Sequence, residues 1–575
     1  MLRLIKKGRI HAMKHKSILR TLTAAVLCCT LCGTGMTVPA FSADDEPELP
    51  AKFDLRDEGA MTPAKRQSHY GCELYAGYAA IESRMIKQGM ADASLDLSED
   101  HCLWFTYGKG KSEDPDDPLF GDGKDRGTEG YQRQVFHADI IATLGSWRGL
   151  ALESEVPIAK ESGPLDESLR YVSVAHLQNS FRYNAEEWTD FPLIKKQIME
   201  KGALAAHYYD ISSPNLYSEY GGFYQPYYNE DNKRIDPDEK VVLEGGGHVV
   251  CVCGWDDNFP KEHFVVMPPA DGAWLCKNSW GANWGKTWDG HGYFYLSYYD
   301  PSISIKQYDI EPVDNYDGIY QRCGAILSKI DIENAGWGFS NIYTAKKDEN
   351  LTAVSFFNRE THLPYEFSIY ALKEGYTNPR DGELLAQISG VEPHWGYHTY
   401  PLQTACSVSA GQVFSVVAKT GIKESARCFF DNNPDNSGTS YYMTYDENGE
   451  SEWKDATAEE DKGNVFLKVF TKDGTAVNEQ NYPDPLYRQA VSKAYDTNED
   501  YVITEKELAD AETFIRGDLN RDSVVNAVDL SLLKQVLLGS ERSDLWLLAG
   551  DWNEDKAINA EDAKGILDFL LQRES

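Results

Sequence analysis

Three short segments carry side chains that could together activate a cysteine nucleophile. Cys72 stands at the start of a helical pattern of apolar residues at 75–81. His248 follows three glycines at the head of an apolar stretch, and Asn278 lies beside Trp280 in an aromatic segment. A thiolate at neutral pH needs a helix N-terminus and a neighbouring imidazole, and a third group must orient that imidazole. The pattern therefore favours nucleophilic thiol chemistry at Cys72.

Each of these residues alone is weak evidence of a site. A lone cysteine is most often a small buried hydrophobe, and a lone His or Asn usually satisfies local hydrogen bonds. Cys251, Cys253 and Cys276 lie inside apolar strand patterns and are predicted to be core. His69 and His101 are interpreted as polar residues of a loop and a helix. The three candidate segments differ from these because of their order along the chain and their flanking motifs.

The three segments strongly resemble the papain family of cysteine peptidases, in its bacterial branch. The matching motifs are FDLRD at residue 53, GGHVVCVCGWDD at residue 246 and KNSWGANWG at residue 277, and the resemblance covers roughly residues 50–312. It implies an α+β papain-like domain that transfers a peptide acyl group to sulfur and then hydrolyses the thioester. The implied roles are nucleophile for Cys72, general base and acid for His248, imidazole orienter for Asn278, and oxyanion-hole donor for Gln67.

Two features depart from the family pattern around the nucleophile. The family has six steps between the oxyanion-hole Gln and the Cys, whereas Gln67 and Cys72 are five apart, and Glu73 stands where the family has Trp. A carboxylate there should disfavour the thiolate and oppose the helix dipole. Two hypotheses therefore stay open. One is an active endopeptidase acting on polypeptides, and the other is a papain-fold adaptor with a degraded catalytic site that binds extracellular polymer.

Two acidic segments near the C-terminus predict calcium loops. A twelve-residue calcium loop supplies oxygen ligands from positions 1, 3, 5, 7, 9 and 12. DLNRDSVVNAVD at residue 518 and DWNEDKAINAED at residue 551 both meet this pattern, 33 residues apart, which a solvated acidic face does not explain. The predicted ligands are Asp518, Asn520, Asp522, the Val524 carbonyl, Asn526 and Asp529 in the first loop, and Asp551, Asn553, Asp555, the Ala557 carbonyl, Asn559 and Asp562 in the second.

This pair of loops resembles a type I dockerin. Both loops open with GDxNxD, end in a short Asp at position 12, and precede a helical pattern. The resemblance implies bound calcium and docking onto a cohesin module of a scaffolding protein, as in a cellulosome that degrades polysaccharide. The typical cohesin-contacting positions 10 and 11 are Ala527 and Val528 in one copy, but Ala560 and Glu561 in the other. This difference suggests one preferred docking face.

A third acidic segment, DTNEDYVITEKE at residue 496, also fits the spacing of a calcium loop but not the dockerin pattern. It is a third candidate calcium site. Its candidate ligands are Asp496, Asn498, Asp500, the Val502 carbonyl, Thr504 and Glu507.

Between these regions, short alternating runs such as 352–357 and 412–418 predict a β-sandwich. This part resembles the lectin-like β-domain that follows the catalytic domain in some bacterial papain-like peptidases. Trp337, Trp395 and Tyr397 could stack on a sugar, although aromatic residues of a sandwich are more often core or rim. Carbohydrate is therefore a partner class that the sequence leaves open.

Length and composition set the outline of the whole chain. At 575 residues it is too long for one core, and its eight cysteines outside the N-terminal segment are too few for a disulfide scaffold. Basic residues before the apolar run 22–31 predict a cleaved secretory signal peptide, since the run is too short to span a membrane. Cleavage would remove seven basic residues and change the net charge from −35 to −42, which argues against nucleic acid and suits divalent cations.

The predicted organisation is therefore multidomain, and the protein is expected to be secreted, extracellular or attached to the cell surface through a scaffold. Catalysis is expected to need no cofactor. The predicted parts are a signal peptide at 1–43, a papain-like domain at 44–312, a lectin-like β-sandwich at 313–472, a linker at 473–485, and a small all-α dockerin at 486–575.

Overall fold

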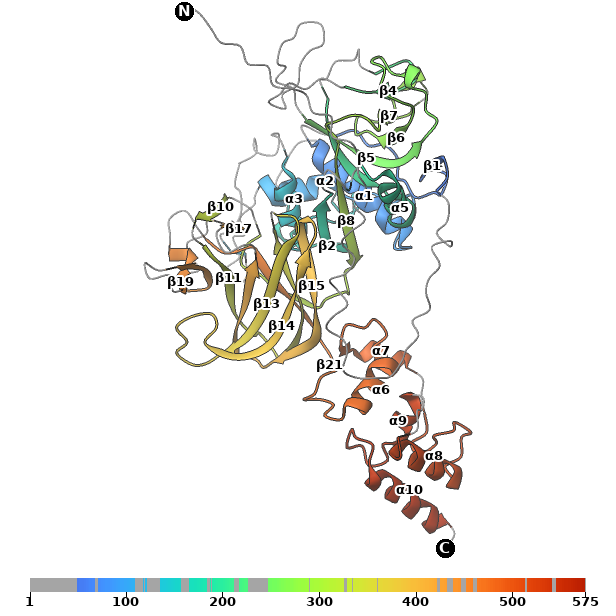
Figure 1. Cartoon of the computed structure of the whole chain (residues 1–575), viewed down its shortest axis with the longest axis vertical. Helices are drawn as coiled ribbons and strands as arrows, with labels where there is room; N and C mark the ends of the chain where they lie inside the picture. Colours follow the sequence, from blue (N-terminus) through green and yellow to red (C-terminus); the bar gives the residue numbers. More distant parts are fainter. Residues whose placement is uncertain are drawn as a thin grey trace, which may run out of the picture. The chain divides into compact units, whose positions relative to one another are not determined.

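A computed structural model describes most of the chain (Figure 1). The predicted signal peptide and His69 lie outside the described residues. The description covers residues 49–573 except 68–70, 109–116, 118, 121–134, 157–164, 184–186, 188, 211–216, 226–246, 289, 325–327, 334, 359, 421–424, 432–437, 446–450, 459–462, 512–513 and 540–543.

The first half of the chain combines helices with one part of a long mixed sheet, in the strand order β4-β7-β6-β5-β3-β8-β2. Its longer helices are α1 (Cys72–Lys87), α2 (Glu99–Leu103), α3 (His137–Leu144) and α5 (Phe191–Lys201). Its strands are β1 (Lys52–Asp54), β2 (Ala175–Arg182), β3 (Leu204–Tyr209), β4 (Gly222–Phe223), β5 (Gly247–Asp256), β6 (Ala273–Lys277), β7 (Tyr293–Ser297) and β8 (Ser304–Pro312). The predicted α+β class is confirmed for this part.

Helix α1 is the central helix of this half and begins at Cys72, as the sequence predicts. It packs against β5, β8 and β3. Twelve of its sixteen residues are buried, including Leu74, Tyr78 and Ile81, so it is a core helix rather than a surface one. The strand cysteines Cys251, Cys253 and Cys276 are fully buried free thiols, which confirms their prediction as core.

The middle of the chain is a β-sandwich, as predicted. One face is the sheet β14-β13-β16-β11-β18-β19, and the other is formed by β15-β12-β20-β9. Phe356 of β12 packs on Phe367 of β13 with ring centroids 6.1 Å apart, so the two faces share one core. The strands are β9 (Gly318–Tyr320), β10 (Ser328–Glu333), β11 (Ala335–Thr344), β12 (Glu349–Phe357), β13 (Leu363–Leu372), β14 (Gly382–Glu392), β15 (Trp395–Val408), β16 (Val413–Thr420), β17 (Ser425–Phe430), β18 (Ser440–Tyr445), β19 (Ser451–Asp455) and β20 (Leu467–Lys472).

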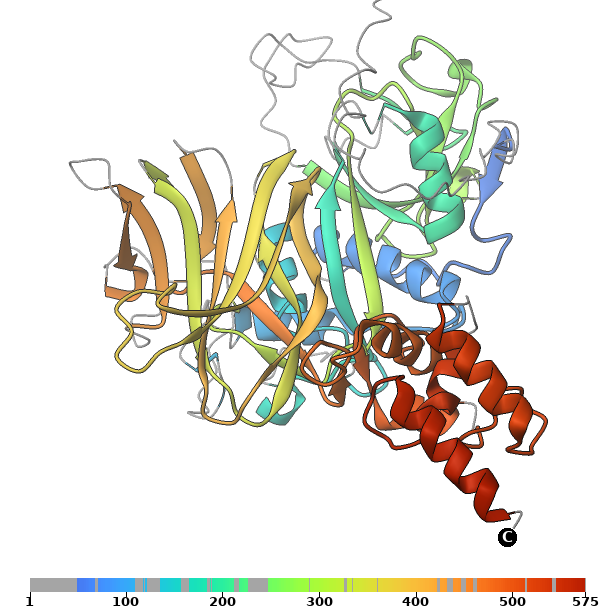
Figure 2. The ribbon, with the colours of Figure 1, turned by 60° about the horizontal axis from the view of Figure 1, so that its bottom comes forward.

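The two parts share a sheet, which the sequence does not predict. Strand β2 pairs antiparallel with β15 through Arg182 opposite Trp395, Phe181 opposite Gly396 and Ser180 opposite Tyr397, and Figure 2 shows the strands continuing from one part into the other. The guanidinium of Arg182 lies 4.6 Å from the Trp395 ring centroid.

This joint accounts for two of the three aromatic residues considered as sugar contacts. Tyr397 is completely buried and therefore cannot contact a sugar, and the partly exposed Trp395 packs against the Arg182 guanidinium. The side chain of Trp337 lies outside the described part of the chain.

The C-terminal part is helical, as predicted for a dockerin. Its elements are β21 (Thr475–Ala476), α6 (Pro485–Tyr495), β22 (Val502–Ile503), α7 (Glu505–Asp510), α8 (Ala527–Leu537), α9 (Asp544–Gly550) and α10 (Ala560–Arg573). Helix α9 precedes the second acidic loop, where only a helix after each loop was expected. The segment predicted as a linker contains β21, which pairs with β22, because an apolar stretch there is buried against the loop that follows. In the described residues, no helix combines the length and the apolarity needed to cross a membrane.

A substitution at the joint tests the shared sheet. A Cβ atom added to Gly396 would lie 2.2 Å from the carbonyl oxygen of Ser180. We expect Gly396→Val to lower the free energy of unfolding by roughly 1–3 kcal/mol because β2 and β15 would be forced apart. Chemical denaturation measures this, with Val391→Thr on the exposed face of β14 as the control. Equal stability of Gly396→Val and the wild type would contradict the close approach.

Candidate active site

Cys72 occupies the first turn of α1, where backbone N–H groups point out of the helix end. The backbone N–H of Val249 on β5 also faces its sulfur. Burial raises the pKa of the Cys72 thiol, and the carboxylate of Glu73 adds to this effect, whereas the ammonium of Lys306 opposes it. The thiol is therefore protonated in the resting site until a base or a bound substrate changes its surroundings.

His248 lies on β5 next to Val249, whose backbone N–H faces the Cys72 sulfur. Its Nε2–H donates to Oδ1 of Asn278 at 2.9 Å, and the ring stacks on Trp280 with centroids 4.9 Å apart. The imidazole is only 7% exposed. Burial lowers the pKa of His248, and the bond to Asn278 partly opposes this. Trp280 thus covers the His248–Asn278 bond, as predicted, and the lower dielectric strengthens it.

Gln67 is tied to the same cluster through Ser279. The backbone N–H of Ser279 donates to Oδ1 of Asn278 at 2.7 Å, and its hydroxyl donates to Oε1 of Gln67 at 2.6 Å. The backbone N–H of Gln67 in turn donates to the Ser279 carbonyl at 2.7 Å. Because Oε1 faces Ser279, the NH₂ end of the Gln67 amide points the other way. Ser279 lies inside the KNSWG motif, which could have identified it, but sequence reasoning assigned it no role.

A second polar group supports His248 from β3. Tyr208 is opposite His248 in the β3–β5 register, and its ring meets the imidazole edge-on at 5.8 Å. Its hydroxyl lies 2.7 Å from that of Tyr217, which donates to Asp210 at 3.3 Å. The negative charge of Asp210 raises the pKa of His248. Sequence reasoning missed this group because nothing local marks these residues.

The structure joins His248, Asn278 and Gln67 in one hydrogen-bonded chain and sets Cys72 beside them. In the described part of the chain, the Cys72 sulfur makes no direct hydrogen bond to the imidazole and lies against Val249 instead. Catalytic hydrogen bonds are often long in ligand-free sites and tighten when substrate binds. The arrangement can therefore support proton transfer between sulfur and imidazole after a small movement of either group.

Glu73, the departure noted in the sequence, is buried in an ion pair below the nucleophile. Nζ of Lys306 on β8 donates to both carboxylate oxygens, at 2.5 and 2.6 Å. Nδ1 of His137 on α3 lies 3.1 Å from Oε1. Both charged side chains are almost fully buried, 2% exposed for Lys306 and 10% for Glu73.

This pair changes the electrostatic effect expected of Glu73. Burial alone would raise the pKa of its carboxyl, but the charge of Lys306 and the bond to His137 hold the pKa below its usual range. Burial and Lys306 together lower the pKa of His137 to about 4, so that imidazole is neutral at pH 7. The sulfur therefore faces a carboxylate whose charge is balanced by an adjacent ammonium. Lys306 and His137 were missed because they are 233 and 64 residues from Glu73 in sequence.

The two C-terminal loops have the shape that the calcium pattern predicts. In the first, both carboxylate oxygens of Asp518 accept backbone N–H groups, from Asp522 and Ser523. Asp551 does the same in the second, with Asp555 and Lys556. Position 6 has positive φ in both loops, 67° at Ser523 and 65° at Lys556, where a calcium loop usually has Gly.

The donor chemistry of these loops fits calcium. The carboxylates at positions 1 and 12, Asp518, Asp529, Asp551 and Asp562, are at most 4% exposed, and burial together with Asp551 raises the pKa of Asp562. A bound cation would offset this crowding of negative charge. Across the described residues, no three acidic, thiol or imidazole side chains converge into a metal site by themselves. Amide and backbone carbonyl oxygens would therefore have to complete the coordination, as in other calcium loops.

Family comparisons agree with this architecture. The model "Papain family cysteine protease" matches residues 158–313, "Lectin like domain" matches 319–471, and "Dockerin type I domain" matches 516–571. The chain joins a papain-family cysteine protease domain to a lectin-like domain and a type I dockerin. The papain-family match includes His248 and Asn278, while Cys72 and Gln67 precede it. Both predicted dockerin loops lie inside the dockerin match, and the third acidic loop lies outside it.

Individual proteins show the same similarity. Procathepsin L of Mus musculus is 26% identical over 252 residues, which cover 41% of this chain and 58% of the mouse protein. Procathepsin L of Rattus norvegicus is 25% identical over 250 residues, with the same coverage. This chain thus matches little more than half the length of these curated relatives. The matches support the predicted cysteine peptidase.

Two solved structures share the arrangement of protease and lectin-like domains. The clostridial cysteine protease Cwp84 after propeptide cleavage superposes with a TM-score of 0.54 and 22% identity, covering 74% of this chain and 99% of that one. The cysteine protease and lectin-like domains of Cwp84, a surface layer associated protein of Clostridium difficile, give 0.53 and 22%, covering 74% and 90%. At this identity the likeness shows a common fold.

Substitutions of the buried ion pair should shift the reactivity of Cys72 in opposite directions. Lys306→Met removes the positive charge that favours the thiolate, so alkylation by iodoacetamide should be severalfold slower at pH 7 and its pH midpoint higher. Glu73→Gln removes the opposing charge, so the midpoint should fall. The pH midpoint of the Lys306→Met, Glu73→Gln double variant should lie between the midpoints of the two single variants. Arg182, His207 and His137, which also interact with Lys306, keep their side chains in all three variants.

The double variant also separates electrostatics from folding. Breaking a buried ion pair on one side costs about 3–5 kcal/mol, whereas replacing both partners costs far less. Circular dichroism would check that each variant is folded before the pH profile is taken. Midpoints that move in the same direction in both single variants would contradict the charge balance described above.

Proposed function

We propose that this protein is a secreted cysteine endopeptidase that hydrolyses peptide bonds through a thioester at Cys72 and is held on a cohesin scaffold by its dockerin. The observation that carries the proposal is the buried bond between His248 and Asn278, placed beside a cysteine at a helix N-terminus. The same three residue types in this arrangement form an activated thiol nucleophile. The papain-family match over the His248 and Asn278 segments supports the assignment.

The proposed reaction follows from the hydrogen bonds of the site. Since Nε2–H of His248 is bonded to Asn278, Nδ1 is the ring nitrogen able to accept the proton of Cys72. The sulfur then attacks the peptide carbonyl, and the imidazolium returns the proton to the leaving amine. The Gln67 amide, whose oxygen is held by Ser279, presents its N–H groups to the carbonyl oxygen as negative charge develops. Water activated by His248 hydrolyses the thioester and restores the thiol.

The competing hypothesis is a papain-fold adaptor whose catalytic site has degraded. Its main support was the carboxylate at Glu73. The ion pair with Lys306 weakens that argument, because it balances the charge beside the sulfur. The burial of Tyr397 also removes one candidate sugar contact from the adaptor, and the Arg182 guanidinium packs on a second, Trp395. We therefore favour the peptidase, with polypeptide as substrate.

Selective labelling tests the proposed catalytic group. An epoxide probe that reacts with activated thiols should modify the wild-type protein at Cys72. His248→Ala should abolish this labelling and lower peptide hydrolysis by at least about 100-fold, because the base is lost. Peptide mapping by mass spectrometry locates the adduct. His101→Ala serves as the matched control, since that buried histidine on α2 contacts the carbonyl of Leu169 instead. Labelling of Cys72 no faster than that of an unfolded thiol would favour the adaptor.

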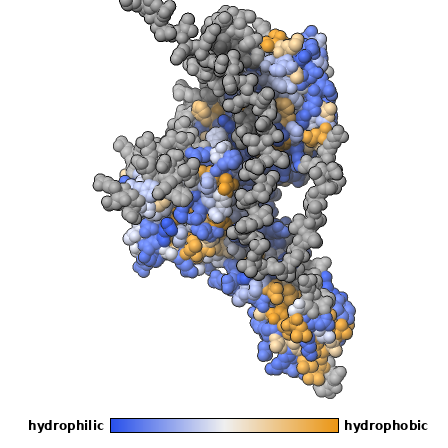
Figure 3. Space-filling view, viewed as in Figure 1, coloured by the Kyte–Doolittle hydropathy of each residue, from blue (hydrophilic) through white to orange (hydrophobic). Residues whose placement is uncertain are grey.

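The dockerin supports attachment to a protein partner. Large apolar side chains are exposed on its two long helices, and Figure 3 shows hydrophobic residues gathered on this part of the surface. A contiguous apolar surface of this kind is typical of a protein interface. We propose that a cohesin binds there through the first repeat, whose Val528 is 52% exposed, and that calcium holds the two loops in shape. The exposed apolar residues are Val528, Leu537 and Leu538 of the α8 region and Leu567 and Leu571 of α10.

The likeness to Cwp84 supports the proposed location outside the cell, since that protein is surface layer associated. The acidic composition and the predicted signal peptide agree with secretion.

Calcium dependence of cohesin binding tests the attachment. Binding to a panel of type I cohesins, measured by isothermal titration calorimetry, should disappear in chelator and in the Asp518→Ala, Asp551→Ala double variant, because both loops lose their position 1 carboxylate. Asp496→Ala in the third acidic loop is the matched control and should bind normally. Cohesin binding that persists in chelator would contradict a structural role for calcium.

A further inference from the structure

The third acidic loop, residues 496–507, copies the backbone of the two dockerin loops. Positions 4 and 6 have positive φ, 59° at Glu499 and 64° at Tyr501, matching 62° and 67° in the first dockerin loop. Asp496 accepts the backbone N–H groups of Asp500 and Tyr501, as Asp518 and Asp551 do in their loops. The third loop therefore has the same shape but belongs to no matched family.

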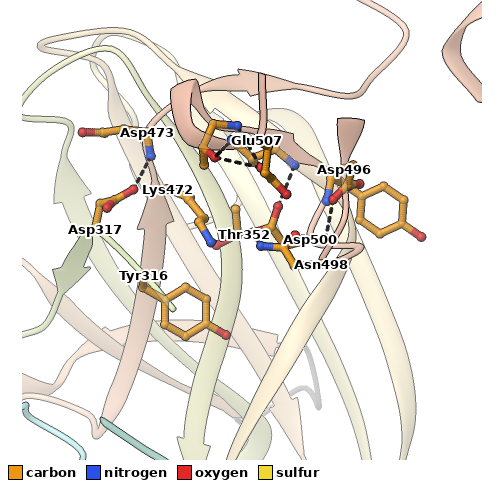
Figure 4. A network of polar contacts seen from close by, with 12 residues as sticks. Tyr316, Asp317, Thr352, Lys472, Asp473, Asp496, Asn498, Asp500 and Glu507 are labelled. Carbon is orange, nitrogen blue, oxygen red and sulfur yellow. Dashed lines mark hydrogen bonds and ion pairs between the residues drawn. The ribbon is translucent and has the colours of Figure 1, made fainter. Parts of the chain in front are cut away.

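One contact distinguishes this loop from the other two. Nζ of Lys472, at the end of β20 in the lectin-like domain, lies 2.7 Å from Oδ2 of Asp500 at loop position 5 (Figure 4). In the dockerin loops the equivalent oxygens, Oδ2 of Asp522 and Asp555, accept the side-chain amide of the Asn at position 3. Oδ2 of Asp500 accepts a hydrogen bond from the side-chain amide of Asn498 in the same way, and it also pairs with the Lys472 ammonium. A fixed positive charge is thus already bound at a calcium-ligating position.

The position 12 carboxylate of the third loop is also fully engaged. Oε1 of Glu507 accepts the backbone N–H and the hydroxyl of Thr497, at 3.0 and 3.1 Å. Oε2 accepts the same two groups of Thr504, at 3.0 and 2.9 Å. Binding a cation there would require breaking some of these bonds. Asp529 of the first dockerin loop also accepts backbone N–H groups on both oxygens, so the two threonine hydroxyl bonds are what set Glu507 apart.

The loop is seated on the lectin-like domain by backbone and apolar contacts. Strand β22, which spans loop positions 7 and 8, pairs with β21, and Val477 donates its backbone N–H to the Tyr501 carbonyl at 2.8 Å. Val502 and Ala476 are buried in one cluster with Ala405 of β15. Lys472 is itself only 7% exposed. These contacts tie the loop to the sandwich over its whole middle section.

We propose that the third loop holds the ammonium of Lys472 in place of calcium, and that its binding partner is the lectin-like domain of the same chain. The loop then acts as a metal-independent clasp. It fixes the start of the C-terminal part on the sandwich and leaves the two dockerin loops to bind calcium. A cavity of about 720 Å³ lined by Tyr316, Lys472, Asp500 and Glu507 adjoins the loop, and we assign the exclusion of cations there to the Lys472 ammonium.

The number of bound calcium ions tests this assignment on the full chain without its signal segment. Isothermal titration calorimetry with calcium chloride should give two ions for the wild type. Lys472→Met should give three, because the loop regains an open position 5 oxygen. Asp500→Asn, which removes the lysine's partner and a calcium ligand together, should give two. Three ions in the wild type, or two in Lys472→Met, would overturn the proposal.

Limited proteolysis of the segment 473–485 provides a second readout. In chelator the wild type should stay protected, since the clasp needs no metal. Lys472→Met should be cut in chelator and protected again by calcium. The matched control is Lys347→Met, which breaks the exposed pair between Lys347 and Asp473 at the same domain edge. It should behave as the wild type does. Cleavage of the wild type that begins only when calcium is removed would contradict a metal-independent clasp.

Discussion

The candidate active site depends on the pairing of strands β5 and β6. His248 lies near the start of β5 and Asn278 directly follows β6, and the register of Cys251 opposite Lys277 places both side chains at the same end of the sheet. Helix α1 packs on β5, so its first residue meets that end. The hydrogen bond between imidazole and amide is therefore fixed by backbone pairing rather than by flexible side chains. Every step proposed for catalysis begins from that geometry.

Two lysines of sheet strands each pair with a carboxylate on another element of this protein. Glu73 beside the nucleophile is paired with Lys306, and Asp500 in the third loop is paired with Lys472. Lys306 lies within β8 and Lys472 ends β20, and each reaches a carboxylate on a different element of the chain. An unpaired carboxylate would be strongly unfavourable at the buried Glu73 and less so at the partly exposed Asp500, and in each case the lysine offsets this cost while fixing how two elements sit together. The pair of Lys306 and Glu73 leaves a balanced charge near the Cys72 sulfur, and the pair of Lys472 and Asp500 fastens the third loop to the lectin-like domain.

The sequence was most informative where the determinants are local. The start of α1 at Cys72 follows from a run of apolar helical residues, and the dockerin loops follow from ligand spacing within twelve residues. The cluster of His248, Asn278 and Gln67 was reachable only through the family motifs, since the three residues are distant in the chain. The lysine partners, the β2–β15 joint and the strand in the supposed linker were not predicted. Each depends on contacts between segments that no local pattern connects.

The shared sheet gives the two N-terminal domains a fixed relationship. Because β2 pairs with β8 of the protease domain and β15 of the sandwich, these two domains form one continuous β-structure. A lectin-like domain joined in this way serves as a support for the catalytic half. The third loop then extends that support to the start of the dockerin through β21 and Lys472.

In the proposed peptidase, Cys72, His248, Asn278 and Gln67 form one catalytic unit. The most direct measurement is a crystal structure of the full chain after reaction with a peptidyl chloromethyl ketone. We expect a covalent bond to the sulfur of Cys72, Nδ1 of His248 within hydrogen-bonding distance of the adduct, and the ketone-derived oxygen facing the Gln67 amide. An unmodified Cys72, or an adduct that points away from His248, would contradict it.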